Sequence, residues 1–364
     1  MKIKQILAVL EDMAPLAYAE DFDNVGLLVG DAANEATGIL VCHDALESVI
    51  DEAIAKQCNL VVCFHPIVFS GLKKITGKNY VERVLLKAIK NNIAIYAVHT
   101  ALDNHKDGVN KIFCDTLGLV NPKMLVQKAN FIRKLVTYTV PENAQMLRDA
   151  LFEAGAGNIG NYDHCSFNSA GTGTYRGNED SNPTIGTKGQ RTQTDEVKIE
   201  VTFEKHRESA ILKALFAHHV YEEVAYEIYN LENQHPQIGL GMIAELETAL
   251  SERDFLQKVK DQLLCDGIRH SAFLGKNIKK VAVLGGSGSF AIAAAIRAGA
   301  DAFLTADLKY HNFYEAENQL LLADIGHFES ERYTKNYIVD FLRKKIPNFA
   351  IVLSEENTNP VKYL

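Results

Sequence analysis

The chain has 364 residues, of which 47% are hydrophobic and 23% charged, an ordinary composition for a globular protein. Its formal net charge of -8 at pH 7 argues against the basic surface by which many proteins capture nucleic acid. At roughly 150 residues per domain, this length predicts two domains side by side, or one large domain that carries an insertion.

The N-terminal segment is basic and then apolar, as a signal peptide is, but the acidic residues Glu11 and Asp12 follow at once. Its apolar residues recur at the spacing of one helix face: Ile3, Ile6, Leu7 and Leu10. We therefore expect an amphipathic first helix rather than a signal peptide. No stretch approaches the roughly 20 apolar residues of a membrane span, so no membrane association is expected.

The first third of the chain alternates short apolar runs with helical patterns. Strands are predicted at 38–42, 60–64 and 93–98, and helices at 48–56, 80–90 and 108–117. Continuously apolar strands separated by helices predict a parallel sheet that is covered by helices on both faces.

The middle third has a different character. Strands are predicted at 131–140, 196–203 and 224–229, and helices at 144–154 and 209–218. The segment 169–194 is rich in Gly, Thr, Asn and Ser, which predicts long mobile loops or the tip of a β-ribbon. The order of elements matches a small ferredoxin-like α+β module, which we place at residues 128–234 as an insertion.

The last third repeats the pattern of the first. Strands are predicted at 280–284, 302–305, 320–324 and 349–353, and helices at 310–317, at 329–345 and in a segment ending near Ala298. The first and last thirds therefore predict half-sheets of similar design, within one discontinuous α/β domain of residues 1–127 and 235–364.

The six cysteines include no CxxC pair, and Cys42, Cys63 and Cys114 lie in apolar runs, as small buried thiols do. This usage is typical of a reducing compartment, and we expect a cytoplasmic protein. A cysteine-based zinc site is not expected, so a metal ion would have to be held by histidine and carboxylate side chains.

His65 and Asp103 each lie just beyond a predicted strand, at the edge where parallel α/β sheets bind ligands. A histidine at that edge can project into a crevice, and the alternative is a turn histidine that bonds to the backbone. Asp103 offers a hard oxygen ligand, and its alternative role is that of a helix N-cap or an Asx turn.

His327 and Glu331 are four residues apart, the spacing by which one helix face offers two ligands to a metal ion. The alternative is a solvated helix start that the helix dipole favours. With His65 and Asp103 they form a mixed set of two imidazoles and two carboxylates, which suits Zn, Mn or Fe rather than Ca. A bridging carboxylate in such a set can serve two ions that activate water.

The glycine-rich segment 285–289 leads from a predicted strand into a helix. Such a turn can cradle an anion at the helix N-terminus, but this one lacks the Walker lysine and does not match GxGxxG. A tight turn into a closely packed helix is therefore the favoured interpretation.

Five segments, in order from about residue 23 to residue 331, resemble the NGG-interacting-factor-three family, also called GTP cyclohydrolase type-two homologues. They are DNVGLLVG at 23–30, FHP at 64–66, HTALDNHKDGVN at 99–110, VAVLGGSGS at 281–289 and DIGHFESE at 324–331. A further segment with Asp307 and His311 resembles one that lines the crevice of the family.

The resemblance implies an α/β fold of two related α/β/α half-domains that form one crevice with two divalent metal ions, Zn, Fe or Mn. It implies four metal ligands, with Glu331 as the bridge and the catalytic carboxylate: His65, Asp103, His327 and Glu331. It also implies a ring-shaped homohexamer, and it makes the insertion at 128–234 similar to the PII-like or CutA-like domain of longer members.

One position departs from the family pattern. The paired histidines of the family are Phe64 and His65 here, and a phenylalanine cannot ligate a metal ion. The second of the two ion sites is therefore weakened, or water or another side chain fills the gap. The other side chains considered are His99, His311 and His43.

These features predict a metal-dependent hydrolase-like enzyme that acts on a small phosphorylated or nucleotide-like metabolite, with a metal-bound water as nucleophile. The alternative is a non-catalytic metal-binding scaffold or regulatory ring in which the inserted module senses a ligand. Nucleic acid is not an expected partner, because the chain is acidic overall.

Overall fold

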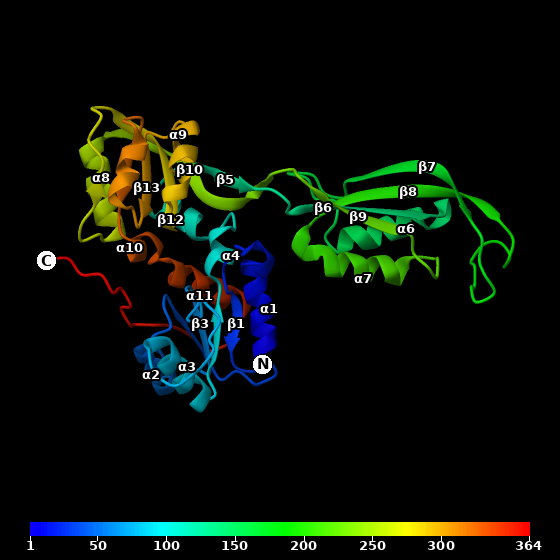
Figure 1. Ribbon diagram of the computed structural model, residues 1–364, viewed down its shortest axis with the longest axis horizontal. Helices are drawn as coiled ribbons and strands as arrows, with labels where there is room; N and C mark the ends of the chain where they lie inside the picture. The colour runs from blue at the N-terminus through cyan, green and yellow to red at the C-terminus, as the bar shows by residue number, and fades with distance from the viewer. The chain divides into compact units, whose positions relative to one another are not determined.

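The computed structural model describes residues 1–364, and Figure 1 shows its helices and strands in chain order. The chain divides into two compact units, one formed by Met1–Gln127 with Pro236–Leu364 and the other by Lys128–His235. None of the helices is both long enough and apolar enough to span a membrane.

A five-stranded sheet of order β1-β4-β3-β2-β15 belongs to the first unit. Its strands are β1 (Gly26–Val29), β2 (Ile39–Cys42), β3 (Leu60–Cys63), β4 (Ala94–Ala97) and β15 (Ile351–Leu353). Strands β15, β2, β3 and β4 are parallel, as predicted, whereas β1 joins β4 as an antiparallel edge strand.

Helices cover both faces of this sheet, because its strands are apolar on both sides (Figure 1). The helices on one face are α1 (Ile3–Met13), which confirms the expected amphipathic first helix, and α11 (Thr334–Lys345). Those on the other face are α2 (Glu47–Ala55) and α3 (Tyr80–Lys90). The alternate residues of β2 and β3 divide between these two cores.

The first unit also contains a six-stranded sheet of order β11-β14-β13-β12-β10-β5. Its strands are β5 (Val120–Lys128), β10 (His235–Ser251), β11 (Arg269–His270), β12 (Asn277–Ser287), β13 (Ala302–Ala306) and β14 (Leu321–Asp324). Strands β12, β13 and β14 are parallel, whereas β10 and β11 pair antiparallel to their neighbours.

Helices also cover both faces of the six-stranded sheet. One face carries α5 (Val109–Thr116) and α8 (Glu252–Leu263), and the other carries α9 (Ile292–Arg297) and the 3-10 helix η4 (Tyr310–Ala316). The remaining short helices of the unit are η1 (Leu16–Tyr18), α4 (His99–Asp103), η3 (Ser289–Ala291) and α10 (His327–Glu331).

Two element predictions for the last third are wrong. The single helix predicted at 329–345 is two helices, α10 and α11, which are separated at Arg332 and Tyr333. The Arg332 guanidinium lies over the rings of Phe328 and Tyr333 and donates to the carbonyl of Leu263, and these contacts hold the junction. The helix predicted at 310–317 is the 3-10 helix η4.

The second unit contains an antiparallel four-stranded sheet of order β7-β8-β6-β9. Its strands are β6 (Ile132–Thr139), β7 (Ser166–Tyr175), β8 (Thr192–Glu204) and β9 (Tyr226–Leu231), and its helices are α6 (Pro141–Glu153), η2 (Lys205–Arg207) and α7 (Glu208–His218). Helices α6 and α7 share one apolar core with the sheet. The two ends of the segment 169–194 pair as the antiparallel strands β7 and β8, as in a β-ribbon, and a long loop at 176–191 connects them.

Candidate metal centre

The ends of parallel strands bring several polar side chains to one place in the first unit. Cys42, Cys63 and Ala97 are level with one another in β2, β3 and β4, so the residues that follow these strands leave the sheet at the same edge. From the other sheet, β14 leads within three residues into α10. The residues that meet here come from both sides of the second unit in the sequence.

The centre of this site is formed by His65, His327 and Glu331. The Oε2 atom of Glu331 lies 3.3 Å from the Nε2 atom of each histidine. The two Nε2 atoms lie 3.4 Å apart, although the two histidines are separated by 262 positions in the chain. The helical spacing of His327 and Glu331 that the sequence predicts is present in α10.

The separations of these three atoms fit a metal ion. Zinc binds imidazole nitrogen and carboxylate oxygen at about 2.0–2.1 Å with tetrahedral angles, which places two ligand atoms about 3.3–3.4 Å apart. The observed separations of 3.3, 3.3 and 3.4 Å have this size. The same three residues form a group that could hold an ion.

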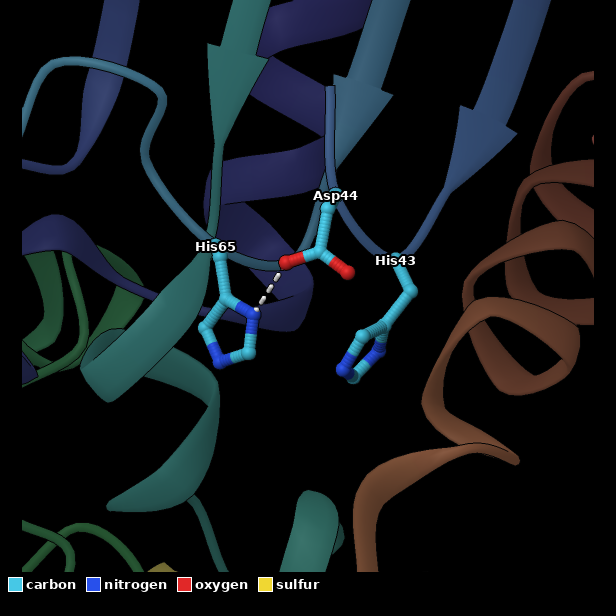
Figure 2. Close-up of side chains that lie close together, drawn as sticks. All are labelled: His43, Asp44 and His65. Carbon is cyan, nitrogen blue, oxygen red and sulfur yellow. Dashed lines mark hydrogen bonds and ion pairs between the residues drawn. The ribbon is translucent and has the colours of Figure 1, made fainter. Parts of the chain in front are cut away.

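Carboxylates fix the orientation of three histidines in the site through their Nδ1 atoms, as Figure 2 shows for His65. The pairs are His65 with Asp44 at 2.8 Å, His99 with Asp23 at 2.8 Å and His327 with Asp307 at 2.6 Å. A carboxylate on one ring nitrogen leaves the other as the ligand atom, the usual arrangement behind a metal-bound histidine.

The charges of this cluster depend on one another. Burial alone would lower the pKa of both histidines, but the carboxylates raise that of His65 to about 9 and that of His327 to about 11. Burial alone would raise the pKa of Glu331, but His327 and His65 hold it well below its usual value. Positive charge on these imidazoles is therefore what keeps the buried Glu331 carboxylate ionised in the metal-free protein.

Asp103 is half-buried, and one oxygen of its carboxyl group is buried without a hydrogen-bond partner. Its Oδ1 atom is inaccessible and has no hydrogen-bond partner. Burial, reinforced by the charge of Glu331, raises the pKa of Asp103 well above its usual range, whereas His65 and His327 oppose this shift. A buried carboxylate without a partner is costly, and a cation beside it would remove that cost.

Two cavities lie against the centre, and the His327 side chain lines both. The larger, of about 420 Å³, is also lined by His43, Asp44, His65, Arg269 and Asp307. The smaller, of about 260 Å³, is also lined by Phe22, His99, Asp103, Phe290 and Glu331. Between them, the two cavities are therefore lined by all four residues that are expected as ligands.

The side chains that could replace the imidazole missing at Phe64 have different positions. Phe64 is fully buried in the core beneath the site, and its ring meets the His99 ring edge-on at 5.6 Å. His99 belongs to the site, whereas His311 packs against the rings of Tyr310 and Tyr314. The acidic partner Asp23 lies in the first of the recognised segments, which was the only sequence signal for it.

The glycine-rich segment 285–289 runs from the end of β12 into the 3-10 helix η3, and it packs closely against α10. The amide of Gly285 donates to Asn110 Oδ1 at 3.0 Å, and that of Gly286 donates to Ser330 Oγ at 2.9 Å. A Cβ atom on Gly286 would lie 2.5 Å from Oε1 of Glu331. These two amides are engaged by the protein itself, the first with α5 and the second with α10.

Comparisons with known proteins agree with the recognised segments. A family model described as Duf34/NIF3 (NGG1p interacting factor 3) matches residues 1–360. A Bacillus subtilis protein named GTP cyclohydrolase 1 type 2 homolog is 37% identical, over 99% of this chain and 98% of the relative.

Solved structures match over the whole chain as well. A crystal structure of a Bacillus cereus protein related to NIF3 has a TM-score of 0.86 and 34% identity, and the match covers 100% of this chain and 99% of that one. A Staphylococcus aureus protein has a TM-score of 0.79 and 29% identity over the same shares. The chain therefore belongs to the Duf34/NIF3 family.

Proposed function

We propose that this protein is a metal-dependent hydrolase with two divalent ions, which acts on a small phosphorylated or nucleotide-like metabolite. The observation that carries the proposal is the triangle of His65 Nε2, His327 Nε2 and Glu331 Oε2, whose sides of 3.3–3.4 Å suit one ion. The name of the Bacillus subtilis relative, GTP cyclohydrolase 1 type 2 homolog, agrees with a nucleotide-like substrate.

The same residues suggest how two ions would be shared. His65, His327 and Glu331 would hold one ion, and Asp103 with its unsatisfied oxygen would hold the second together with Glu331. Bound divalent ions of this kind supply a Lewis acid and lower the pKa of water toward neutrality. Glu331 would link the two positions, because its Oε2 atom approaches both imidazoles and its side chain lines the smaller cavity.

The protein side chains supply orientation and charge for this reaction. Asp44 and Asp307 hold the imidazoles of His65 and His327 with Nε2 toward Glu331. Arg269 lines the larger cavity and is the cationic group placed to meet an anionic substrate there. Its guanidinium is held by Asp324 and by the carbonyl of Leu308.

Elemental analysis and a substrate screen test the proposal. We expect close to two Zn, Fe or Mn ions per chain after reconstitution, and turnover of a nucleotide or phosphoester that Glu331→Gln abolishes. The matched control is Glu315→Gln, at an exposed glutamate on η4. This variant should retain both the bound metal and the turnover. Absence of bound metal after reconstitution would exclude the proposal.

A metal-binding scaffold or regulator is the second candidate function, and one observation favours it. The second unit has its own cavity of about 400 Å³, lined by Tyr138, Tyr175 and Tyr221, with the Tyr221 hydroxyl donating to Glu196 at 2.8 Å. A regulator would bind ligands from the same screen without turning them over, and Glu331→Gln would leave that binding unchanged.

The organisation of the chain completes the proposal. We propose that the first unit is a discontinuous domain of two half-domains, and that the second is a ferredoxin-like, PII- or CutA-like insertion. The order β7-β8-β6-β9, with helices between β6 and β7 and between β8 and β9, supports the ferredoxin-like fold.

The remaining expectations concern assembly and location. The resemblance supports a homohexameric ring, which light scattering on the purified protein would test. The six free thiols support a cytoplasmic location, where they stay reduced.

A further inference from the structure

His43 is a buried imidazole of the site that no carboxylate orients and that lies outside the triangle of His65, His327 and Glu331. His43 follows β2 directly and is only 3% exposed. Neither of its ring nitrogens has a hydrogen-bond partner. Burying a polar group in this way is costly unless something binds it, so the position calls for an occupant beside the ring.

The sheet register places His43 level with Phe64. Cys42 pairs with Cys63 across β2 and β3, so the next residues of the two strands, His43 and Phe64, leave the sheet side by side. Their rings stack at 5.4 Å with an interplanar angle of 28°. His43 therefore presents, from the neighbouring strand, the imidazole that position 64 lacks.

The ring of His43 also faces the proposed ligands. Its Nε2 atom lies 3.6 Å from Glu331 Oε2, the oxygen that both other histidines approach. Its ring centroid lies 4.7 Å from that of His65. Figure 2 shows both imidazoles directed to the same side, beyond the ends of their strands.

Asp44 lies between these two histidines, and each of its carboxylate oxygens already accepts a hydrogen bond. Its Oδ1 atom accepts from His65, and its Oδ2 atom accepts from the hydroxyl of Thr358 at 2.6 Å. His43, Asp44 and His65 also form a group that could hold an ion, but an ion on Asp44 would compete with the contacts that orient His65 and Thr358. An ion beside Glu331 would use the free Nε2 atom of His43 and leave Asp44 in its orienting role.

We propose that His43 is the fourth protein ligand of the ion held by His65, His327 and Glu331. This inference rests on the proposed function. A set of four protein ligands closes a tetrahedral site, whereas an ion that activates water keeps an open position. The open position then belongs to the second ion, at Asp103 in the smaller cavity.

The test compares three variants of the full-length protein, stripped of metal with a chelator and titrated with Zn²⁺ and Co²⁺. We expect His43→Leu to weaken binding of the tighter ion by at least about tenfold, since even residues behind a ligand contribute about 10–100-fold. The visible absorption of the tighter-bound Co²⁺ should change as well. The matched control, His218→Leu on the exposed end of α7, should bind as the wild type does.

The double variant His43→Phe with Phe64→His moves the imidazole one strand over at the same register. It should regain most of the lost affinity, which a purely structural role of His43 would not allow. If His43→Leu does not fold, the double variant decides. If neither variant folds, the wild type is loaded with one Zn²⁺ per chain and its X-ray absorption spectrum is measured. We expect three imidazole ligands on this ion.

The outcomes separate this inference from the proposed function. A wild type that binds no metal would overturn the proposed function. A wild type that binds metal and loses it in His65→Ala, but keeps its affinity and Co²⁺ spectrum in His43→Leu, would overturn only the role of His43. An X-ray absorption spectrum that shows only two imidazole ligands would also overturn the role of His43. So would a folded double variant that does not regain metal affinity.

Discussion

At the residue scale, the site separates carboxylates that orient from carboxylates that would bind. Asp44 and Asp307 each accept from the Nδ1 atom of a histidine, and hydrogen bonds hold the pKa of both below its usual value despite burial. Asp103 has an oxygen without a partner, and burial raises its pKa. Asp44 and Asp307 therefore stay charged without a metal ion. Asp103 needs a bound cation to offset the free-energy cost of its charge.

Asp44→Ala tests the orienting role. The variant frees the imidazole of His65 to rotate, so we expect metal affinity to fall by about 10–100-fold with the number of ions per chain unchanged. Competition with a chromophoric chelator measures this. The control, Asp51→Ala, removes a carboxylate that is 62% exposed and pairs with Lys87 on the surface. Equal affinity in both variants would contradict the role of Asp44.

The sequence could predict those site residues that lie in local patterns. The spacing of His327 and Glu331 in one helix, and the position of His65 after an apolar strand, mark these residues as candidates, and the family resemblance implies that they are ligands. The acidic partners could not be predicted in this way, because Asp23 is 76 positions from His99 and Asp44 is 21 positions from His65. Only the register of the sheet brings such residues together.

At the element scale, α10 is positioned by the glycines that precede α9. A side chain at Gly286 would collide with Oε1 of Glu331, and its φ of +67° is unfavourable for other residues. The turn therefore has to contain glycine for the Glu331 carboxylate to approach the histidines.

Gly286→Ala should displace Glu331 and lower metal affinity by more than tenfold, measured by the same chelator competition. Gly275→Ala is the matched control, because Gly275 has a similar φ of +71° but a Cβ atom there would meet nothing within 4 Å. Both variants carry a backbone strain of about 1–2 kcal/mol. Loss of affinity in both would mean that strain alone, and not the collision, disturbs the site.

The start of α3 gives a prediction of pH dependence. The Glu82 carboxylate accepts from the backbone amides of Lys78 and Thr76, which lowers its pKa to about 2. Since the folded pKa lies below the usual 4.5, the stabilisation is present above pH 4.5 and is lost as the pH falls toward 2.

Glu82→Gln should therefore have a lower Tm than the wild type at pH 7, and the difference should shrink between pH 4.5 and pH 2. Thermal melts across this range measure it. Glu142→Gln, in the first turn of α6, controls for the helix dipole alone. A difference in Tm that persists unchanged at pH 2 would contradict the assignment to the Glu82 carboxylate.

Most elements of the first unit could be predicted because their strands are continuously apolar and their helices amphipathic. The long strand β10 could not be predicted, since Pro236, Gly239 and Gly241 interrupt its pattern. The break between α10 and α11 depends on contacts of Arg332 with residues outside the helix, so no local pattern marks it.

At the scale of the whole molecule, the site joins residues from the two ends of the chain. His43, His65 and Asp103 precede the second unit in sequence, and His327 and Glu331 follow it. The site therefore forms only after both parts of the first unit have folded together. Contacts across so many residues are slow to form, because a long loop must close first.

The second unit enters and leaves through two neighbouring strands, which makes its removal a test of the whole arrangement. Strands β5 and β10 are adjacent in the six-stranded sheet, and a Cβ atom on Gly239 would lie 2.1 Å from the carbonyl oxygen of Val126. A chain in which a short glycine-rich turn replaces 129–234 can keep this pairing. We expect it to unfold cooperatively and to bind as many ions per chain as the full protein, measured by melting and elemental analysis. A folded variant that binds no metal would show that the second unit is required for the metal centre. In that case the chain would contain every expected ligand, but the ligands would not come together.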